Sequence, residues 1–172
     1  STLSSLWGMY NGYELCENNA VPGKEEYLNS EKYDFKIWDW NRKGNIKEYI
    51  KKLNWIRKEN PALQYYRNLK FYQADNDNII FYGKISPDKK NIIMVAVNLD
   101  PFHTQEGVLH ITIYEIGIKP EHTYVLNELI TQERKIVRGA YYKVFLDPKN
   151  EPVTIFKLER WSYRENNFDY YL

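Results

Sequence analysis

The sequence predicts a mainly β fold, an antiparallel β-sandwich preceded by a strand, a long loop and an amphipathic helix. Two observations predict it. After residue 68 the chain consists of short runs rich in β-branched and aromatic residues, separated by turn-forming stretches such as residues 75–78 and 87–90. Before that point, apolar residues recur at helical spacing between Ile46 and Ile56. Because no helical pattern interrupts the later runs, they favour a sandwich with Greek-key crossings.

The first part of the chain contains three expected elements. Residues 6–15 form a mostly apolar run broken by two glycines, which indicates a buried strand leading into a loop. Residues 17–44 are polar and Asn-rich without a period, and loops of that length are often functional. The helix that follows has Asn45 as a good N-cap, with Glu48 placed as in a capping box, and Pro61 stops it.

The second part is expected to contain seven or eight short strands. The runs of strand type cover residues 69–74, 79–85, 91–99, 108–114, 124–129, 141–146 and 153–158. The predicted organisation is therefore a first unit at residues 1–68, a β-sandwich at 69–160 and a tail at 161–172.

Charge and cysteine content exclude several classes of protein. The formal charge is +1, which produces no field that would attract nucleic acid or an anionic membrane. The single cysteine, Cys16, cannot form an intrachain disulfide, and no apolar run approaches the roughly 20 residues that span a bilayer. We expect a soluble, cytoplasmic protein. The chain starts at Ser1 without an initiator Met, which suits a fragment of a longer polypeptide.

Aromatic residues make up 16% of the chain, including 16 Tyr and 5 Trp. Flat amphipathic rings suit sugar faces, because they stack on CH groups and still offer a hydroxyl or an indole N–H. Strands favour aromatic residues in any case, so this abundance alone also fits an ordinary sandwich.

Other chemistries have little support. His103, His110 and His122 have no neighbouring Cys or Asp at metal-ligand spacing, so a zinc site is not expected. No P-loop, dinucleotide fingerprint or nucleophile elbow is present. Glu14 and Glu17 are interpreted as carboxylates that fix loop geometry by accepting backbone hydrogen bonds.

A strand, a loop and one helix cannot bury their own faces, and together they match one repeat of a parallel (β/α)8 barrel, whose sites lie on the loops after the strands. Four segments carry a family resemblance: residues 7–18, which contain GYELCEN, residues 25–33, residues 53–63, which end in NPAL, and residues 97–106. In this order they resemble GlgE-type maltosyltransferases of the α-amylase clan. The resemblance implies the last β/α unit of the barrel, followed by a C-terminal sandwich of the α-amylase type.

The resemblance also implies a reaction. A maltosyl unit would pass from α-maltose 1-phosphate to the non-reducing end of an α-1,4-glucan, with retention and release of phosphate, and without a metal or organic cofactor. A retaining mechanism needs a carboxylate nucleophile and a second carboxyl that acts as acid and then base. In this clan those acids follow earlier strands, so no catalytic residue is expected in this chain, which alone should be inactive. The implied partners are the barrel domain and a second copy in a full-length homodimer.

Lys32 and Tyr33 match the family positions that contact maltose 1-phosphate. An ammonium is a compact partner for phosphate, and a phenol hydroxyl adds a directional hydrogen bond.

Two rival interpretations remain open. One is a carbohydrate-binding sandwich with no catalytic parent, and the other is the C-terminal part of an amylase-like hydrolase or a branching enzyme. Saturable binding of maltooligosaccharides by this chain alone would favour the first. Release of reducing sugar instead of phosphate would favour the second.

Overall fold

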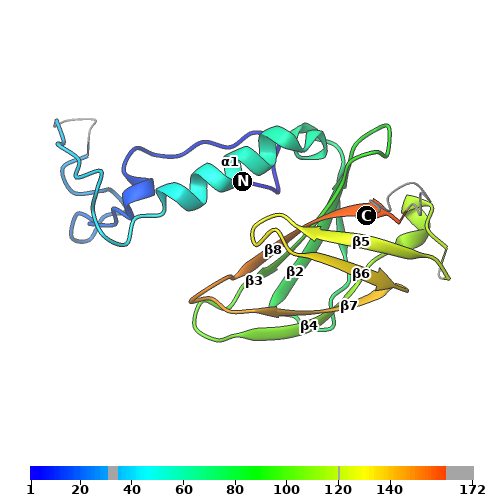
Figure 1. Cartoon of the computed structure of the whole chain (residues 1–172). Helices are drawn as coiled ribbons and strands as arrows, with labels where there is room; N and C mark the ends of the chain where they lie inside the picture. The colour runs from blue at the N-terminus through cyan, green and yellow to red at the C-terminus, as the bar shows by residue number, and fades with distance from the viewer. Residues whose placement is uncertain (31–34, 120, 162–172) are drawn as a thin grey trace, which may run out of the picture.

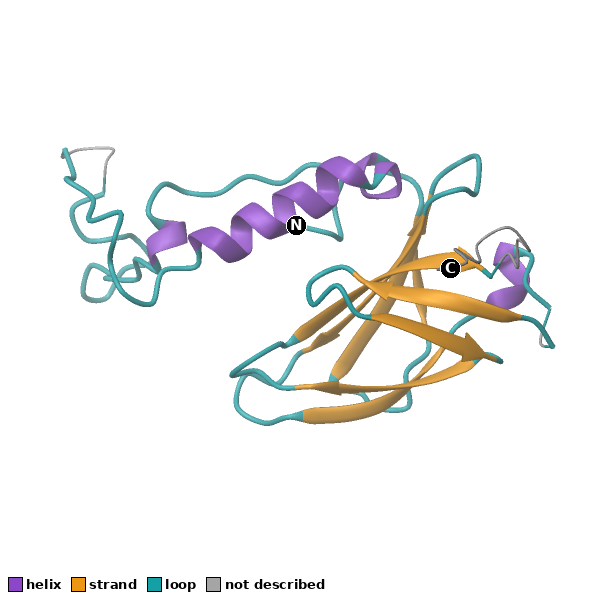
Figure 2. Cartoon of the chain, in the orientation of Figure 1, coloured by secondary structure: helices purple, strands orange, loops and turns teal. Residues whose placement is uncertain are grey.

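The computed structural model describes residues 1–30, 35–119 and 121–161. One α-helix, α1 (Lys47–Glu59), precedes the strands, and short 3-10 helices lie at η1 (Tyr13–Leu15), η2 (Pro61–Gln64) and η3 (Ile113–Ile116). The strands are β1 (Leu69–Tyr72), β2 (Ile79–Ile85), β3 (Ile92–Asn98), β4 (Gln105–His110), β5 (Thr123–Glu128), β6 (Arg134–Arg138), β7 (Tyr141–Leu146) and β8 (Val153–Arg160). Figure 2 shows the strands gathered on one side of the molecule and α1 on the other.

The strands form an antiparallel sandwich, as the sequence predicts. One sheet has the order β1-β2-β3-β8-β5-β6, and β4 and β7 form the second (Figure 1). Strands β5, β6 and β7 follow one another, and β8 then returns to pair with β5. This is the Greek-key connection, and it crosses between the sheets because β6 and β7 belong to different ones.

The large sheet is covered on both faces, which accounts for the continuous apolar runs in β2 and β3. Phe81 and Met94 belong to the core between the two sheets. Their neighbours Tyr82 and Ile93 point to the opposite face and belong to a second core under the helix. A strand that is buried on both faces cannot show simple alternation.

The helix packs on the sheet through the predicted apolar stripe. Ile56 is fully buried in the second core, and Tyr49 and Leu53 pack against it. The N-cap is Ile46 and not the predicted Asn45, although Asn45 Oδ1 accepts a hydrogen bond from the Lys47 backbone N–H at 3.3 Å. Glu48 forms no capping box and pairs instead with Lys51. The helix ends before Pro61, which opens η2.

The predicted strand at residues 6–15 is wrong. The segment contains no strand; its backbone ends in η1, and Leu6 is 84% exposed. A strand needs a neighbouring strand to bond to, and no strand in the described part of the chain pairs with these residues. The residues just before the segment are held by Arg57, whose guanidinium donates to the carbonyls of Ser4 and Ser5 at 2.9 and 2.7 Å.

Two further expectations are corrected. The run at residues 108–114 was expected to be one strand, but β4 ends at His110, and Ile113 and Ile116 bury their side chains from η3 at the three-residue spacing of that helix. The sequence also gave no sign of β6 as a separate strand.

A polar junction joins α1 to the sandwich and leads to a pH-dependent prediction. The Tyr49 hydroxyl donates to Glu151 Oε1 at 2.7 Å. Burial and the nearby Glu128 raise the pKa of Glu151 above its usual value, against the opposing effects of Tyr49 and Lys52. Because the folded-state pKa exceeds the unfolded one, this carboxyl stabilises the fold most at low pH, and that contribution is lost as pH rises through the folded pKa.

We therefore expect Glu151→Gln to stabilise the chain at pH 7, since the amide oxygen still accepts from Tyr49 but carries no charge. The gain should be below about 1 kcal/mol because Glu151 is partly exposed. Urea denaturation of both proteins between pH 4 and pH 7 measures it. An advantage that is equal at both ends of this range would contradict the shifted pKa.

Candidate functional site

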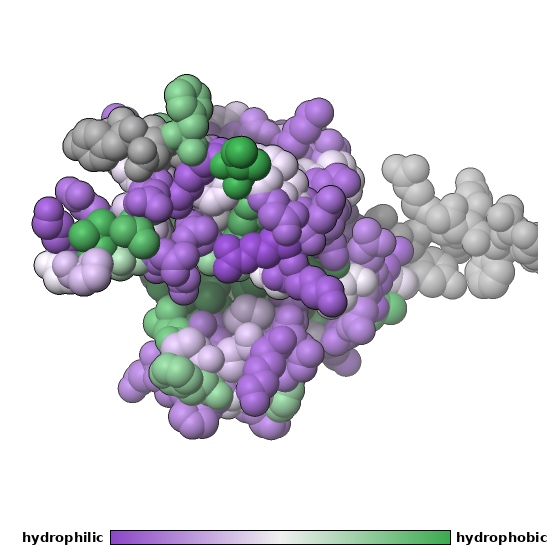
Figure 3. Space-filling model, turned by 90° about the vertical axis from the view of Figure 1, so that its left-hand side faces the viewer, coloured by the Kyte–Doolittle hydropathy of each residue, from purple (hydrophilic) through white to green (hydrophobic). Residues whose placement is uncertain are grey.

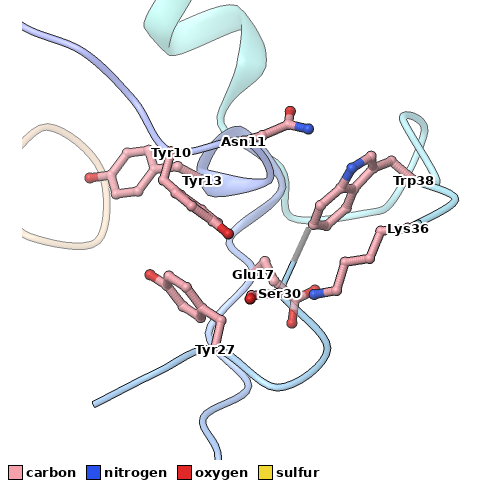
Figure 4. Close-up of a pocket in the computed structure, with 8 residues that line it drawn as sticks. All are labelled: Tyr10, Asn11, Tyr13, Glu17, Tyr27, Ser30, Lys36 and Trp38. Carbon is pink, nitrogen blue, oxygen red and sulfur yellow. The ribbon is translucent and has the colours of Figure 1, made fainter. Parts of the chain in front are cut away.

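Aromatic side chains converge in a small pocket on the first part of the chain (Figure 4). They come from residues far apart in the loop region, and polar side chains lie between them. The residues that line the pocket are Tyr10, Asn11, Tyr13, Glu17, Tyr27, Ser30, Lys36 and Trp38.

A tight turn at Gly12 sets the position of this pocket. Gly12 has φ +91°, and its carbonyl accepts from the N–H groups of Leu15 and Glu17 at 3.0 and 3.1 Å. The Trp38 ring lies directly over Gly12: a Cβ there would be 2.4 Å from the ring edge. Only glycine fits, because the position requires both a left-handed backbone and the absence of a side chain.

A short turn presents Tyr27 to the pocket. Ala20 and Tyr27 form an antiparallel bridge, and Val21 N–H donates to the Glu26 carbonyl at 2.8 Å. Tyr27 then stacks on Tyr10, with ring centroids 5.5 Å apart and planes 22° apart. The two rings are partly exposed and form a small aromatic surface.

The polar side chains carry both signs of charge. The Lys36 ammonium lies 4.9 Å from the centre of the Trp38 ring. Glu17 accepts from Asn19 Nδ2 at 2.9 Å and lies 3.6 Å from Arg42. Stacked rings suit a sugar face and an ammonium suits an anion, so the pocket combines the groups that a sugar phosphate needs.

The two residues predicted for donor contact, Lys32 and Tyr33, lie outside the described residues. They stand in the chain between Ser30 and Lys36, both of which line the pocket. The sequence alone did not predict Tyr10, Tyr27, Lys36 or Trp38 as site residues. The only signal for them was the density of aromatic residues in an Asn-rich loop.

The other residues considered from the sequence have local roles. Glu17 accepts a weak bond from the Asn19 backbone N–H at 3.4 Å, and Glu14 contributes its carbonyl to Ile46. His103 bonds to Asp100 and His110 stacks on Tyr141. In the described ranges, no group of three or more His, Cys, Asp or Glu could hold a metal ion. The described residues also contain no helix with the length and apolar character that a membrane span requires.

Comparison with known proteins gives a consistent result. The family model described as "GLGE, C-terminal" matches residues 71–158. The chain is 52% identical over 158 residues to the alpha-1,4-glucan:maltose-1-phosphate maltosyltransferase of Rhodospirillum rubrum. That alignment covers 92% of this chain and 23% of the relative. It is 45% identical over 170 residues to the maltosyltransferase of the same name from Myxococcus xanthus, in an alignment that covers 99% of this chain and 25% of the relative. The chain thus spans about a quarter of the length of these curated relatives.

Solved structures resemble the chain in fold. The α-amylase of Geobacillus thermoleovorans, in complex with acarbose, matches with a TM-score of 0.63 at 18% identity, over 90% of this chain and 30% of that one. An Anoxybacillus α-amylase matches with a TM-score of 0.55 at 18% identity, over 91% and 29%. At this level of identity the likeness shows the fold alone.

Proposed function

This chain belongs to the GlgE family, whose C-terminal model it matches, and we propose that it forms the C-terminal part of an α-1,4-glucan:maltose-1-phosphate maltosyltransferase. The full-length protein would transfer maltosyl units from α-maltose 1-phosphate to the non-reducing end of α-1,4-glucans, with retention and release of phosphate. The named relatives match nearly the whole chain, including the loops before the sandwich, and this observation carries the proposal.

The aromatic pocket is the part of this chain that we assign to the donor. Its rings would hold glucosyl faces, and Lys36 would act with Lys32 and Tyr33 on the phosphate. Lys32 and Tyr33 are assigned from the family resemblance, and their place in the sequence between two pocket residues supports the assignment.

The catalytic acids belong to another part of the polypeptide in this proposal. A retaining mechanism needs two carboxyl groups about 5 to 5.5 Å apart. Among the described residues that line the pocket, Glu17 is the only carboxylate, and it is engaged by Asn19 and Arg42. The chain on its own would then bind donor weakly and transfer nothing.

Residues 1–68 would complete a (β/α)8 barrel and form one side of its site. Large apolar side chains are exposed along this part of the chain, among them Leu6, Phe35, Ile37, Trp55 and Tyr66. On the face shown in Figure 3, apolar areas stand apart from one another on a mostly hydrophilic surface. Neighbouring barrel strands would supply the backbone partners that residues 6–15 lack here and would cover these side chains. The sandwich would then pack against the last barrel helix and stabilise it. The full-length protein would act as a homodimer.

Phosphate release from α-maltose 1-phosphate, with maltoheptaose as acceptor, tests the proposal. The comparison is between this chain and the same chain extended upstream through the barrel. We expect release from the extended protein only. Release of reducing sugar without phosphate would indicate a hydrolase, and release from this chain alone would place the chemistry elsewhere.

In the extended protein, we expect Lys32→Ala to raise the KM for maltose 1-phosphate at least tenfold, which corresponds to the loss of one charge-assisted contact to phosphate. Lys24→Ala is the matched control, because Lys24 is an exposed lysine of the same loop region that does not line the pocket. Steady-state phosphate release measures both. Equal KM values for the two variants would remove Lys32 from the donor site.

A further inference from the structure

The sandwich has an open seam between β6 and β7. At the other edge of the small sheet, β4 is joined to the residues that follow β1. Leu109 forms a β-bridge with Ala74, and the His110 N–H donates to the Gln73 carbonyl at 2.9 Å. On the near side, β7 pairs only with β4 and β6 only with β5 among the described strands. The two strands meet at the turn around Gly139 and diverge from it (Figure 1).

A cleft of about 350 Å³ occupies this seam, within the range of small-molecule sites. Consecutive residues of β7, from Tyr142 to Leu146, form one wall, and β5, β6 and β8 form the other. The residues that line it are Glu106, Glu128, Lys135, Tyr142, Lys143, Val144, Phe145, Leu146, Thr154 and Phe156.

Aromatic rings stand at the floor and the rim of the cleft. Tyr142 meets Phe156 edge to face, with centroids 5.3 Å apart and planes at 83°, so its ring is held in one orientation. Phe145 is 64% exposed at the rim. Tyr142 lies on the inner face of β7 and Phe145 on the outer face, so Phe145 is the ring whose apolar surface is open to a flat ligand.

The lining of the cleft contains two carboxylates and two lysines, and each of these charged groups has a partner. Glu128 accepts from Ile155 N–H at 3.0 Å and from the hydroxyls of Thr154 and Thr131 at 3.3 and 2.8 Å. Lys135 pairs with Glu133 at 3.0 Å, and Lys143 pairs with Glu106. A site without net charge favours a neutral ligand, and its many hydrogen-bonding groups favour one rich in hydroxyls.

A peptide strand is the less suitable occupant. Strand β6 has the sequence Arg-Lys-Ile-Val-Arg, and β7 carries Lys143 at its centre. Charged side chains on strand edges oppose the addition of a further strand, and proteins use them for that purpose. A neutral sugar chain bonds to these groups through hydroxyls and does not need the backbone ladder.

We propose that this seam is a second, non-catalytic binding site for α-1,4-glucan. The proposal rests on the proposed function, in which an α-glucan is the acceptor. A short stretch of glucosyl units lies in the cleft with a CH face on Phe145 and its hydroxyls toward Lys135, Lys143 and the Tyr142 hydroxyl. A second binding site for a long acceptor raises the local concentration of its chain ends at the transfer site without altering the transfer reaction.

Titration of the 172-residue chain with maltoheptaose, followed by amide and side-chain NMR shifts, tests the site. We expect saturable shifts on β6 and β7, and Phe145→Ala should weaken this binding about five- to tenfold, as for the loss of one stacking ring. Tyr142→Phe, which keeps the ring and removes only the hydroxyl, should give a smaller loss with the fold intact. Cellohexaose, with β-1,4 links, should bind more weakly.

Tyr141→Ala is the matched control, because Tyr141 is 67% exposed on the same strand and does not line the cleft. Trp38→Ala separates the seam from the aromatic pocket of the first part of the chain. Absence of shifts on β6 and β7, a loss with Tyr141→Ala equal to that with Phe145→Ala, or a loss with Trp38→Ala alone would each overturn the seam site.

In the extended protein, Phe145→Ala should raise the KM for glycogen several-fold and the KM for maltoheptaose much less, because only a long acceptor reaches the seam and the transfer site together. Equal effects on both acceptors would overturn the role in acceptor capture. This experiment also separates the two proposals. Absence of phosphate release with every acceptor would refute the transferase, whereas binding at the seam would be measured independently in the shorter chain.

Discussion

Replacing Phe81 by alanine is expected to lower the free energy of unfolding by about 3 to 5 kcal/mol, the usual cost of removing a buried aromatic side chain. Phe81 is 2% exposed in the core between the two sheets, next to Tyr72, whose ring centroid lies 5.7 Å away. The strand around it pairs on both sides, with β1 and with β3, so the backbone cannot easily collapse into the cavity. The thermal midpoint should fall by roughly 6 to 20 °C.

Phe102→Ala is the matched control for this prediction. Phe102 is 78% exposed in the loop after β3, so its removal should change the free energy of unfolding by less than about 0.5 kcal/mol. Urea denaturation followed by circular dichroism measures both variants. A loss below about 1 kcal/mol for Phe81→Ala would show that Phe81 is not tightly packed between the two sheets.

The strands that the sequence predicted well are those that turn-forming residues delimit. The limits expected for β2 and β7 agree with the structure, because apolar runs there stop at turn-forming residues. The sequence did not predict strand β6 because three of its five residues are basic. The strand lies at the edge of the large sheet, where a strand does not need an apolar pattern. Its existence depends on pairing with β5, which the local sequence does not encode.

The first part of the chain was harder to predict for a related reason. The helix was predictable because its apolar stripe and its flanking Asn45 and Pro61 are local signals. No strand in the described part of the chain pairs with residues 6–15, so the apolar residues there gave a misleading pattern.

The candidate site was predictable only in part. Lys32 and Tyr33 came from the family resemblance, which carries no information on what surrounds them. The meeting of Gly12 with Trp38 and of Tyr10 with Tyr27 depends on the path of a long loop, and no periodicity reports that path. Such contacts can be identified only in the folded structure.

Gly12→Ala is expected to disrupt the aromatic pocket. The substitution has two costs: alanine is strained by about 1 to 2 kcal/mol at a left-handed position, and its Cβ would lie 2.4 Å from the Trp38 ring, which must move. Because the pocket then loses one wall, the KM for maltose 1-phosphate in the extended protein should rise at least tenfold if the pocket binds the donor. The sandwich core is separate, so its thermal midpoint should change little.

Gly23→Ala isolates the contact with Trp38 from the strain of the backbone. Gly23 also has a positive φ, +74°, but nothing lies within 4 Å of the Cβ that would be added. Both variants therefore incur the backbone cost, and only Gly12→Ala displaces the ring. Limited proteolysis of residues 1–44 and the NMR signal of the Trp38 indole N–H report the local structure, and phosphate release reports the donor. If the two variants behave alike, backbone strain accounts for the effect and Trp38 does not shape the site. If only Gly12→Ala loses donor affinity, the ring over Gly12 is the wall that the donor needs.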